Sequence, residues 1–114
     1  MGTKDIFYSA ALLFRSLRNG AYLPENLWEE SVILIRAYSP EEALEKANKI
    51  GRTGGTTYTA TDGSEVTWEF FKVECVFQVI DDLAIDGLAD GAEVFSRFLR
   101  NSEVESLLTP FEET

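Results

Sequence analysis

The segment at residues 6–17 constrains the fold most, because it is apolar on both faces of any strand that it forms. One face carries Ile6, Tyr8, Ala10, Leu12 and Phe14, and the other carries Phe7, Ala11, Leu13 and Leu17. A strand of this kind is stable only where both faces are covered. The sequence therefore predicts a central strand with cover on each side. The terminal helix, a folded-over part of the sheet or a second subunit would supply the second cover, and we expect a homodimer.

Residues 28–38 have β-branched and alternating apolar residues and predict a second strand. The next segment has strong helix signals. Ser39 is a good N-cap, Pro40 suits the first helical position, and Glu42 completes a capping box. We expect a helix over residues 40–50, ended by Gly51.

The second half of the chain predicts three more strands and a short helix. Strands are expected at residues 56–61, 65–80 and 93–100, with a two-residue hairpin turn at Asp62-Gly63. The alternation of the long strand changes phase at Phe70-Phe71, which predicts a β-bulge. Ser102 and Glu105 form a second capping-box pattern, and Pro110 ends the helix that follows.

This order predicts one domain over residues 1–114 of the α+β class. We expect a mainly antiparallel sheet of about five strands in the order strand, strand, helix, strand, strand, strand, helix. One main helix covers a face of this sheet, and a short helix lies at the C-terminus. The apolar share of 45% fits a packed core.

Composition excludes several classes of function. The chain has no His and one Cys, so it lacks the commonest general base and the commonest zinc ligand. Cys75 lies among apolar residues and is predicted to be a core residue. We expect no enzymatic activity, no cofactor and no metal site. With no export or membrane-spanning segment and an unpaired Cys, the expected location is the cytoplasm.

The charge is unevenly distributed. Ten basic and twenty acidic residues give a net charge of −10, and the whole excess lies in residues 58–114. This balance argues against nucleic acid or an anionic membrane as partner. It favours a basic protein partner, although a solvated surface that aids solubility is the alternative.

The acidic loop at residues 81–92 and its edges hold five of these acids. They are the predicted partner-binding residues Asp81, Asp82, Asp86, Asp90 and Glu93. Residues 82–93 also match a twelve-residue calcium loop in part, but Ala84 stands where a ligand is needed. Whether the loop binds calcium, binds a partner or is only solvated stays open.

A different set of residues predicts a ligand site. Tyr8, Trp28, Arg36 and Trp68 lie on the predicted strands and would line a groove, unless the two Trp residues simply cap the core. Together with Arg97, such a groove would stack and clamp a nucleotide-like small molecule.

The chain resembles a small bacterial family of unknown function. The resemblance rests on five blocks: Phe7-Tyr8-Ser9-Ala10, Trp28-Glu29-Glu30-Ser31-Val32, the helix start at residues 39–44, Trp68 with Phe70, and residues 90–97. It implies one compact bacterial α+β domain and no particular activity. It also directs attention to Glu29, Glu30 and Arg97, and so adds Glu30 to the predicted ligand site.

Two functional hypotheses follow. The first is a non-enzymatic interaction protein of a bacterium or phage that binds a basic protein through the acidic C-terminal half, as immunity proteins and counter-defence inhibitors do. The second is a dimeric domain that binds a nucleotide-like small molecule at Tyr8, Trp28, Glu30, Arg36, Trp68 and Arg97.

Overall fold

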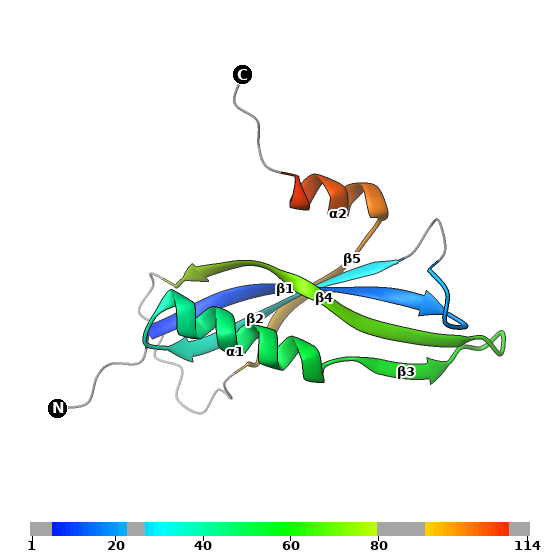
Figure 1. The fold of residues 1–114 in the computed structure, drawn as a ribbon, viewed down its shortest axis with the longest axis horizontal. Coiled ribbons are helices and arrows are strands. Elements are labelled where there is room, and N and C mark those ends of the chain that lie inside the picture. Colours follow the sequence, from blue (N-terminus) through cyan, green and yellow to red (C-terminus); the bar gives the residue numbers. More distant parts are fainter. Residues whose placement is uncertain (1–5, 23–26, 80–90, 110–114) are drawn as a thin grey trace, which may run out of the picture.

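The computed structural model describes residues 6–22, 27–79 and 91–109 (Figure 1). Five strands form one sheet in the order β3-β4-β1-β2-β5, and each neighbouring pair is antiparallel. The predicted α+β class, the antiparallel sheet and the order of the elements are confirmed. The elements are β1 (Ile6–Arg18), β2 (Trp28–Ala37), α1 (Pro40–Thr53), β3 (Thr56–Thr59), β4 (Glu65–Gln78), β5 (Glu93–Leu99) and α2 (Asn101–Leu108).

β1 is the central strand, as its two apolar faces predicted. It pairs with β2 on one side and with β4 on the other. Tyr8, Ala10, Leu12 and Phe14 point to one face, where they join residues of β2 and α1 in the main buried cluster. We call this side the α1 face. Because α1 contributes small residues to the cluster, it packs closely on the sheet.

The opposite face of β1 is covered in part by α2, and we call it the α2 face. Leu13, Trp28, Leu99 and Val104 form a second buried cluster there. The indole Nε1 of Trp28 donates a hydrogen bond to Oδ1 of Asn101 at 2.6 Å, which ties the start of α2 to β2. The terminal helix, one of the three covers predicted for this face, thus supplies part of that cover.

The helix α1 starts as predicted but ends later. Ser39 is its N-cap, and the Ser39 hydroxyl accepts a hydrogen bond from the amide of Glu42 at 3.1 Å. The prediction that Gly51 ends the helix is wrong, because α1 continues to Thr53 and Gly54 is its C-cap. Gly51 is buried against the ring of Phe70, so the close approach of β4 explains a glycine there.

The long strand β4 contains the predicted irregularity and a second one. Its register against β1 shifts between Phe70 and Lys72, which leaves Phe71 as an extra residue at the predicted bulge. A second shift between Val73 and Cys75 leaves Glu74 extra. Each bulge turns the following side chains to the other face of the sheet.

Other boundaries differ by a few residues. α2 begins at Asn101 with Arg100 as its N-cap, not at Ser102, because the Glu103 carboxylate accepts a hydrogen bond from the Arg100 amide at 3.2 Å. β3 ends at Thr59 rather than at residue 61. The predicted two-residue turn at Asp62-Gly63 is wrong, because Ala60 pairs with Ser64 and leaves a three-residue loop, in which Gly63 has a φ of +87°. Pro110 lies outside the described residues.

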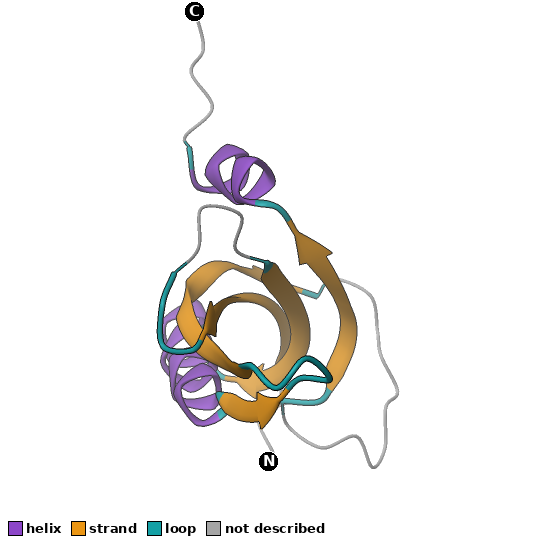
Figure 2. Ribbon diagram, turned by 90° about the vertical axis from the view of Figure 1, so that its right-hand side faces the viewer, coloured by secondary structure: helices purple, strands orange, loops and turns teal. Residues whose placement is uncertain are grey.

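The sheet curls strongly, as Figure 2 shows in a view turned by 90°. Because of this curl, Trp68 of β4 reaches Phe98 of β5 across the two strands between them, with ring centroids 6.0 Å apart. The curl brings side chains of the α1 face toward one another. Among the described residues, neither helix has the length and apolar character needed to cross a bilayer.

The contact between Gly51 and Phe70 gives the first prediction. A β-carbon on Gly51 would overlap the Phe70 ring, so Gly51→Ala should lower the free energy of unfolding by about 1–3 kcal/mol. In an ordinary helix interior the same change stabilises by about 1 kcal/mol. Urea unfolding measures the difference, with the exposed Lys49→Ala as control. Unchanged or higher stability of Gly51→Ala would contradict the prediction.

Candidate functional site

An open groove of about 390 Å³ lies on the α1 face, next to the C-terminal end of α1. Aromatic side chains from four strands form most of its wall: Phe14 of β1, Tyr58 of β3, Trp68 of β4 and Phe98 of β5. The C-cap Gly54 also lines it. We call this the Glu29 groove, after the carboxylate that it contains.

Two of the aromatic residues of the groove remain open to solvent, whereas Phe14 is buried. Phe98 is 62% exposed and Tyr58 is 49% exposed, although both belong to strands. Nε1 of Trp68 donates to the Tyr58 hydroxyl at 3.5 Å, which links β3 to β4 inside the groove. Exposed aromatic residues gathered from separate strands are typical of binding surfaces.

Glu29 lies among these rings on β2. It stands opposite Phe14 on one neighbouring strand and Phe98 on the other, and it is half-buried. Burial is the main cause that raises the pKa of Glu29, and the nearby Glu93 carboxylate raises it further. Among the described residues, no group forms a hydrogen bond or an ion pair with the Glu29 carboxyl.

Glu93, one of the five predicted partner-binding acids, lies at the start of β5 beside this groove. Its carboxylate accepts a hydrogen bond from the Ser31 hydroxyl at 2.7 Å, and Glu93 itself is exposed. Two acidic side chains therefore share one rim of the sheet. Asp81, Asp82, Asp86 and Asp90 lie outside the described residues, as does most of the partial calcium loop.

A second acidic cluster lies on the α2 face. Glu30 is 6% exposed, and its Oε1 accepts a hydrogen bond from Nε of Arg97 at 2.8 Å. Its carboxyl group also hydrogen-bonds that of Glu74, which the second bulge brings across β1 from β4. No described N–H or hydroxyl group donates to the buried Oε2 of Glu74. Because two carboxylates this close repel each other, the pair binds one proton more tightly than a separate carboxyl would.

The pKa values of the two carboxyls move apart. Burial, followed by the hydrogen bond and the negative charge of Glu30, raises the pKa of Glu74 to about 7. For Glu30 burial acts upward, but the hydrogen bonds from Glu74 and Arg97 outweigh it and lower the pKa. Below pH 7, Glu30 is therefore the carboxylate and Glu74 the acid of this pair.

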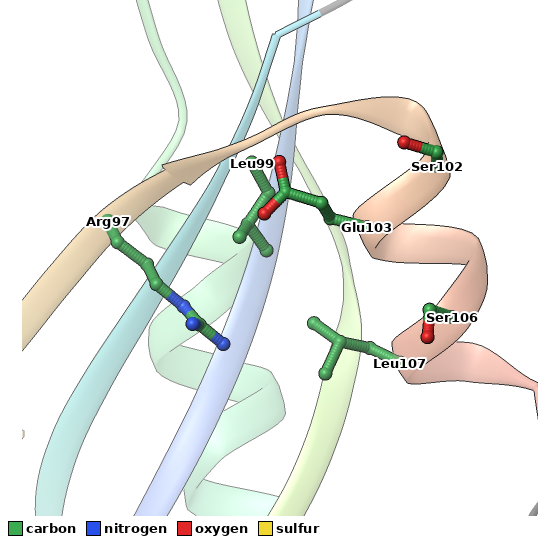
Figure 3. Close-up of a pocket in the computed structure, with 6 residues that line it drawn as sticks. All are labelled: Arg97, Leu99, Ser102, Glu103, Ser106 and Leu107. Atoms are coloured by element: carbon green, nitrogen blue, oxygen red, sulfur yellow. The ribbon is translucent and has the colours of Figure 1, made fainter.

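Arg97 connects this pair to a small pocket between β5 and α2. The pocket has a volume of about 290 Å³ and is lined by Arg97, Leu99, Ser102, Glu103, Ser106 and Leu107. Figure 3 shows Glu103 and Leu107 pointing from α2 toward Arg97 and Leu99. Arg97 already pairs with Glu30 and lies near the Glu103 carboxylate. These negative charges largely neutralise the guanidinium, so it would attract an anionic ligand only weakly.

The six residues of the predicted ligand site do not come together. Tyr8 and Trp68 lie on the α1 face, where Tyr8 is buried in the core and Trp68 lines the Glu29 groove. Trp28, Glu30, Arg36 and Arg97 belong to the α2 face. Among these, Glu30 and Arg97 form a direct pair, while the Arg36 guanidinium lies over the Phe7 ring. The sheet itself separates the two sets.

Cys75 is half-buried, and burial is the first cause that raises the pKa of its thiol. The nearby Glu74 and Glu30 act in the same direction. A thiol with a raised pKa is a poor nucleophile at neutral pH. Among the described residues, no group of three or more His, Cys, Asp or Glu side chains is placed to hold a metal ion.

Sequence reasoning missed two parts of these sites. Tyr58 and Phe98 were assigned to strands but not to a groove, because the curl of the sheet that joins them has no local sequence pattern. Glu74 was passed over because the predicted bulge accounted for one irregularity only. The second is at Glu74, a charged residue that stands between the apolar residues Val73 and Cys75.

The carboxyl pair gives a prediction about pH. Unfolded Glu74 loses its proton near the ordinary value of 4.5, whereas folded Glu74 holds it to about 7. In that range the folded state binds more protons, so this contribution to stability is complete below pH 4.5 and is lost as pH rises through 7. Glu74→Gln keeps a neutral side chain at every pH and lacks this loss. The free energy of unfolding of the variant minus that of the wild type should therefore rise by about 1–3 kcal/mol from pH 5 to pH 8.

Urea unfolding of both proteins at the two pH values tests this prediction. Comparison with the wild type removes the opposite pH dependence of carboxyls with lowered pKa values, such as Asp62 and Glu69. Glu45→Gln, an exposed change on α1, should show the same difference from the wild type at both pH values. A difference for Glu74→Gln that is flat from pH 5 to pH 8 would contradict the shared proton.

Comparison with known proteins identifies one family. The model of a family described as a domain of unknown function, DUF4288, matches residues 7–96. No curated protein and no solved structure matches the chain. The family match includes β1, β2, α1, β3 and β4, which carry most of the residues of the Glu29 groove and the Glu30–Glu74 pair. The chain belongs to the DUF4288 family.

Proposed function

We propose that this chain is a non-enzymatic interaction domain that binds a basic protein partner, in the manner of a bacterial immunity protein or a phage counter-defence inhibitor. The observation that carries the proposal is the half-buried Glu29 carboxyl, which has no hydrogen-bond or ion-pair partner among the described residues. Desolvating a carboxylate without a partner is costly, so such a group is best explained by a cation supplied from outside.

The distribution of charge supports the same partner. Residues 58–114 carry the whole net charge of −10, and Glu93 of this half lies beside Glu29. A concentrated negative potential speeds the encounter with a basic protein and repels acidic competitors. The acidic half thus steers the partner, and the groove receives it.

The groove is less suited to a nucleotide-like ligand. Phosphate groups need cations or backbone amides, whereas this groove contains a carboxylate and has a second one at its rim. Arg36 and Arg97, the predicted clamps, lie on the α2 face. These features favour the protein partner over the small molecule.

The experiment starts with tagged protein expressed in the native host, identification of co-purified proteins, and purification of the partner. We expect a basic protein whose association rate falls about tenfold between 50 and 300 mM salt. Neutralising Asp81, Asp82, Asp86, Asp90 and Glu93 together should leave the unfolding free energy almost unchanged and abolish binding.

A control variant with Glu41→Gln, Glu45→Gln and Glu65→Gln removes three exposed acids from α1 and β4 and should keep most of the binding. Light scattering on the same samples tests the expected homodimer. The proposal fails if no partner is recovered, if association is independent of salt, or if the two variants bind equally well.

A further inference from the structure

We propose that the Glu29 groove seats one arginine side chain of the bound protein, with the guanidinium paired to Glu29 and stacked on the aromatic wall. This inference relies on the proposed function for the source of the arginine. The chemistry of the groove itself is tested independently of any partner.

The first argument is a comparison between two neighbouring residues of β2. Glu29 and Glu30 point to opposite faces of the sheet, and each stands beside a residue of β5. Glu30 faces Arg97 and forms an ion pair at 2.8 Å. Glu29 faces Phe98 instead, and no described cation reaches it. The fold thus provides an arginine for one carboxyl and leaves a space with aromatic walls at the other.

The second argument concerns the walls of the groove. The face of an aromatic ring carries partial negative charge and attracts a cation, most strongly at Trp. Trp68, Phe98 and Tyr58 present such rings around Glu29, and Phe98 and Tyr58 are about half exposed or more. A cation bound there would be attracted by the rings and by the carboxylate together.

The third argument is the field at the end of α1. The C-terminus of a helix carries partial negative charge from its unpaired carbonyl groups. α1 ends at Thr53, and its C-cap Gly54 lines the groove. With Glu93 near Glu29, three sources of negative potential meet at this place.

The shape of the wall favours arginine over lysine. Trp68 and Phe98 contact each other, with rings inclined by 35° and centroids 6.0 Å apart, and so form one aromatic surface on which a planar group can stack. Guanidinium is planar, more weakly hydrated than ammonium and able to bond a carboxylate with two N–H groups. A lysine ammonium has neither the plane nor the second aligned donor.

The test uses Nα-acetyl-arginine amide as probe, with the neutral isostere Nα-acetyl-citrulline amide and with Nα-acetyl-lysine amide for comparison. The NMR signal of the Trp68 indole N–H reports binding. We expect a saturable shift with the arginine probe, and affinities at least fivefold weaker for citrulline and measurably weaker for lysine. Equal binding of citrulline and arginine would overturn the proposal, and equal binding of lysine would overturn the choice of arginine.

Three variants complete the test. Glu29→Gln and Phe98→Ala should each weaken the arginine probe about fivefold or more, and Glu45→Gln should leave its affinity unchanged. Phe98 is 62% exposed, so its removal should leave the fold intact, which unfolding curves check. Full affinity in Glu29→Gln would overturn the proposal.

The outcomes separate the two proposals. If the arginine probe binds as expected but no basic protein partner is found, the groove assignment stands and the proposed function fails. If a partner binds in a salt-dependent way and equally well to Glu29→Gln and Phe98→Ala, the proposed function stands and the groove assignment is overturned.

Discussion

The pairing of β1 with strands on both sides is the constraint on which the rest of the structure depends. β1 is apolar on both faces and lies in the middle of the sheet, so each neighbouring element is positioned against it. α1 covers one face through its small residues Ala43 and Ala47, and α2 covers part of the other through Val104. Burial of apolar surface is the main stabilising term, so these contacts hold the strands in a fixed register. That register decides which polar side chains become neighbours.

The bulges of β4 connect this packing to the chemistry of the α2 face. In a regular strand, side chains alternate strictly between the two faces of the sheet. In β4 the extra residues Phe71 and Glu74 each interrupt this alternation. Glu74 then reaches across β1 to Glu30, and Phe71 reaches Trp28 with ring centroids 5.1 Å apart. The irregularities that weaken the ladder locally thus place an aromatic contact and a shared proton on the same face.

Much of the fold follows from local patterns in the sequence. The two-sided segment at residues 6–17 and the capped start of α1 each specify an element through contacts within a few residues, and both elements are present. Asp62-Gly63 marks the position of the β3–β4 turn, but the loop is one residue longer than predicted. The ends of elements were less predictable. Local sequence alone predicts that the helix ends at Gly51. Its position inside the helix is explained only by its contact with Phe70, nineteen residues away.

The sites depend on longer-range geometry. Trp68 and Phe98 become neighbours through the curl of the whole sheet, and Tyr8 and Trp68 are separated from Trp28 and Arg97 by the sheet itself. Sequence reasoning assigned Glu30 and Arg97 to a ligand site, whereas the structure pairs them with each other. It grouped them with residues of the other face because the register between separate strands decides which side chains share a face, and that register has no local signal in the sequence.

The register between β2 and β5 finally decides which of two adjacent carboxyls is satisfied. Opposite residues in an antiparallel pair share a face, so Glu30 meets Arg97 and Glu29 meets Phe98. A shift of one residue would exchange these partners and bury an arginine beside the aromatic wall. The bulge at Val94 interrupts this ladder before its last pair, Ile33 with Glu93, and Glu93 then accepts the hydrogen bond of Ser31 on the side of Glu29. A single strand pairing therefore produces both a closed ion pair on one face and an open, negatively charged groove on the other.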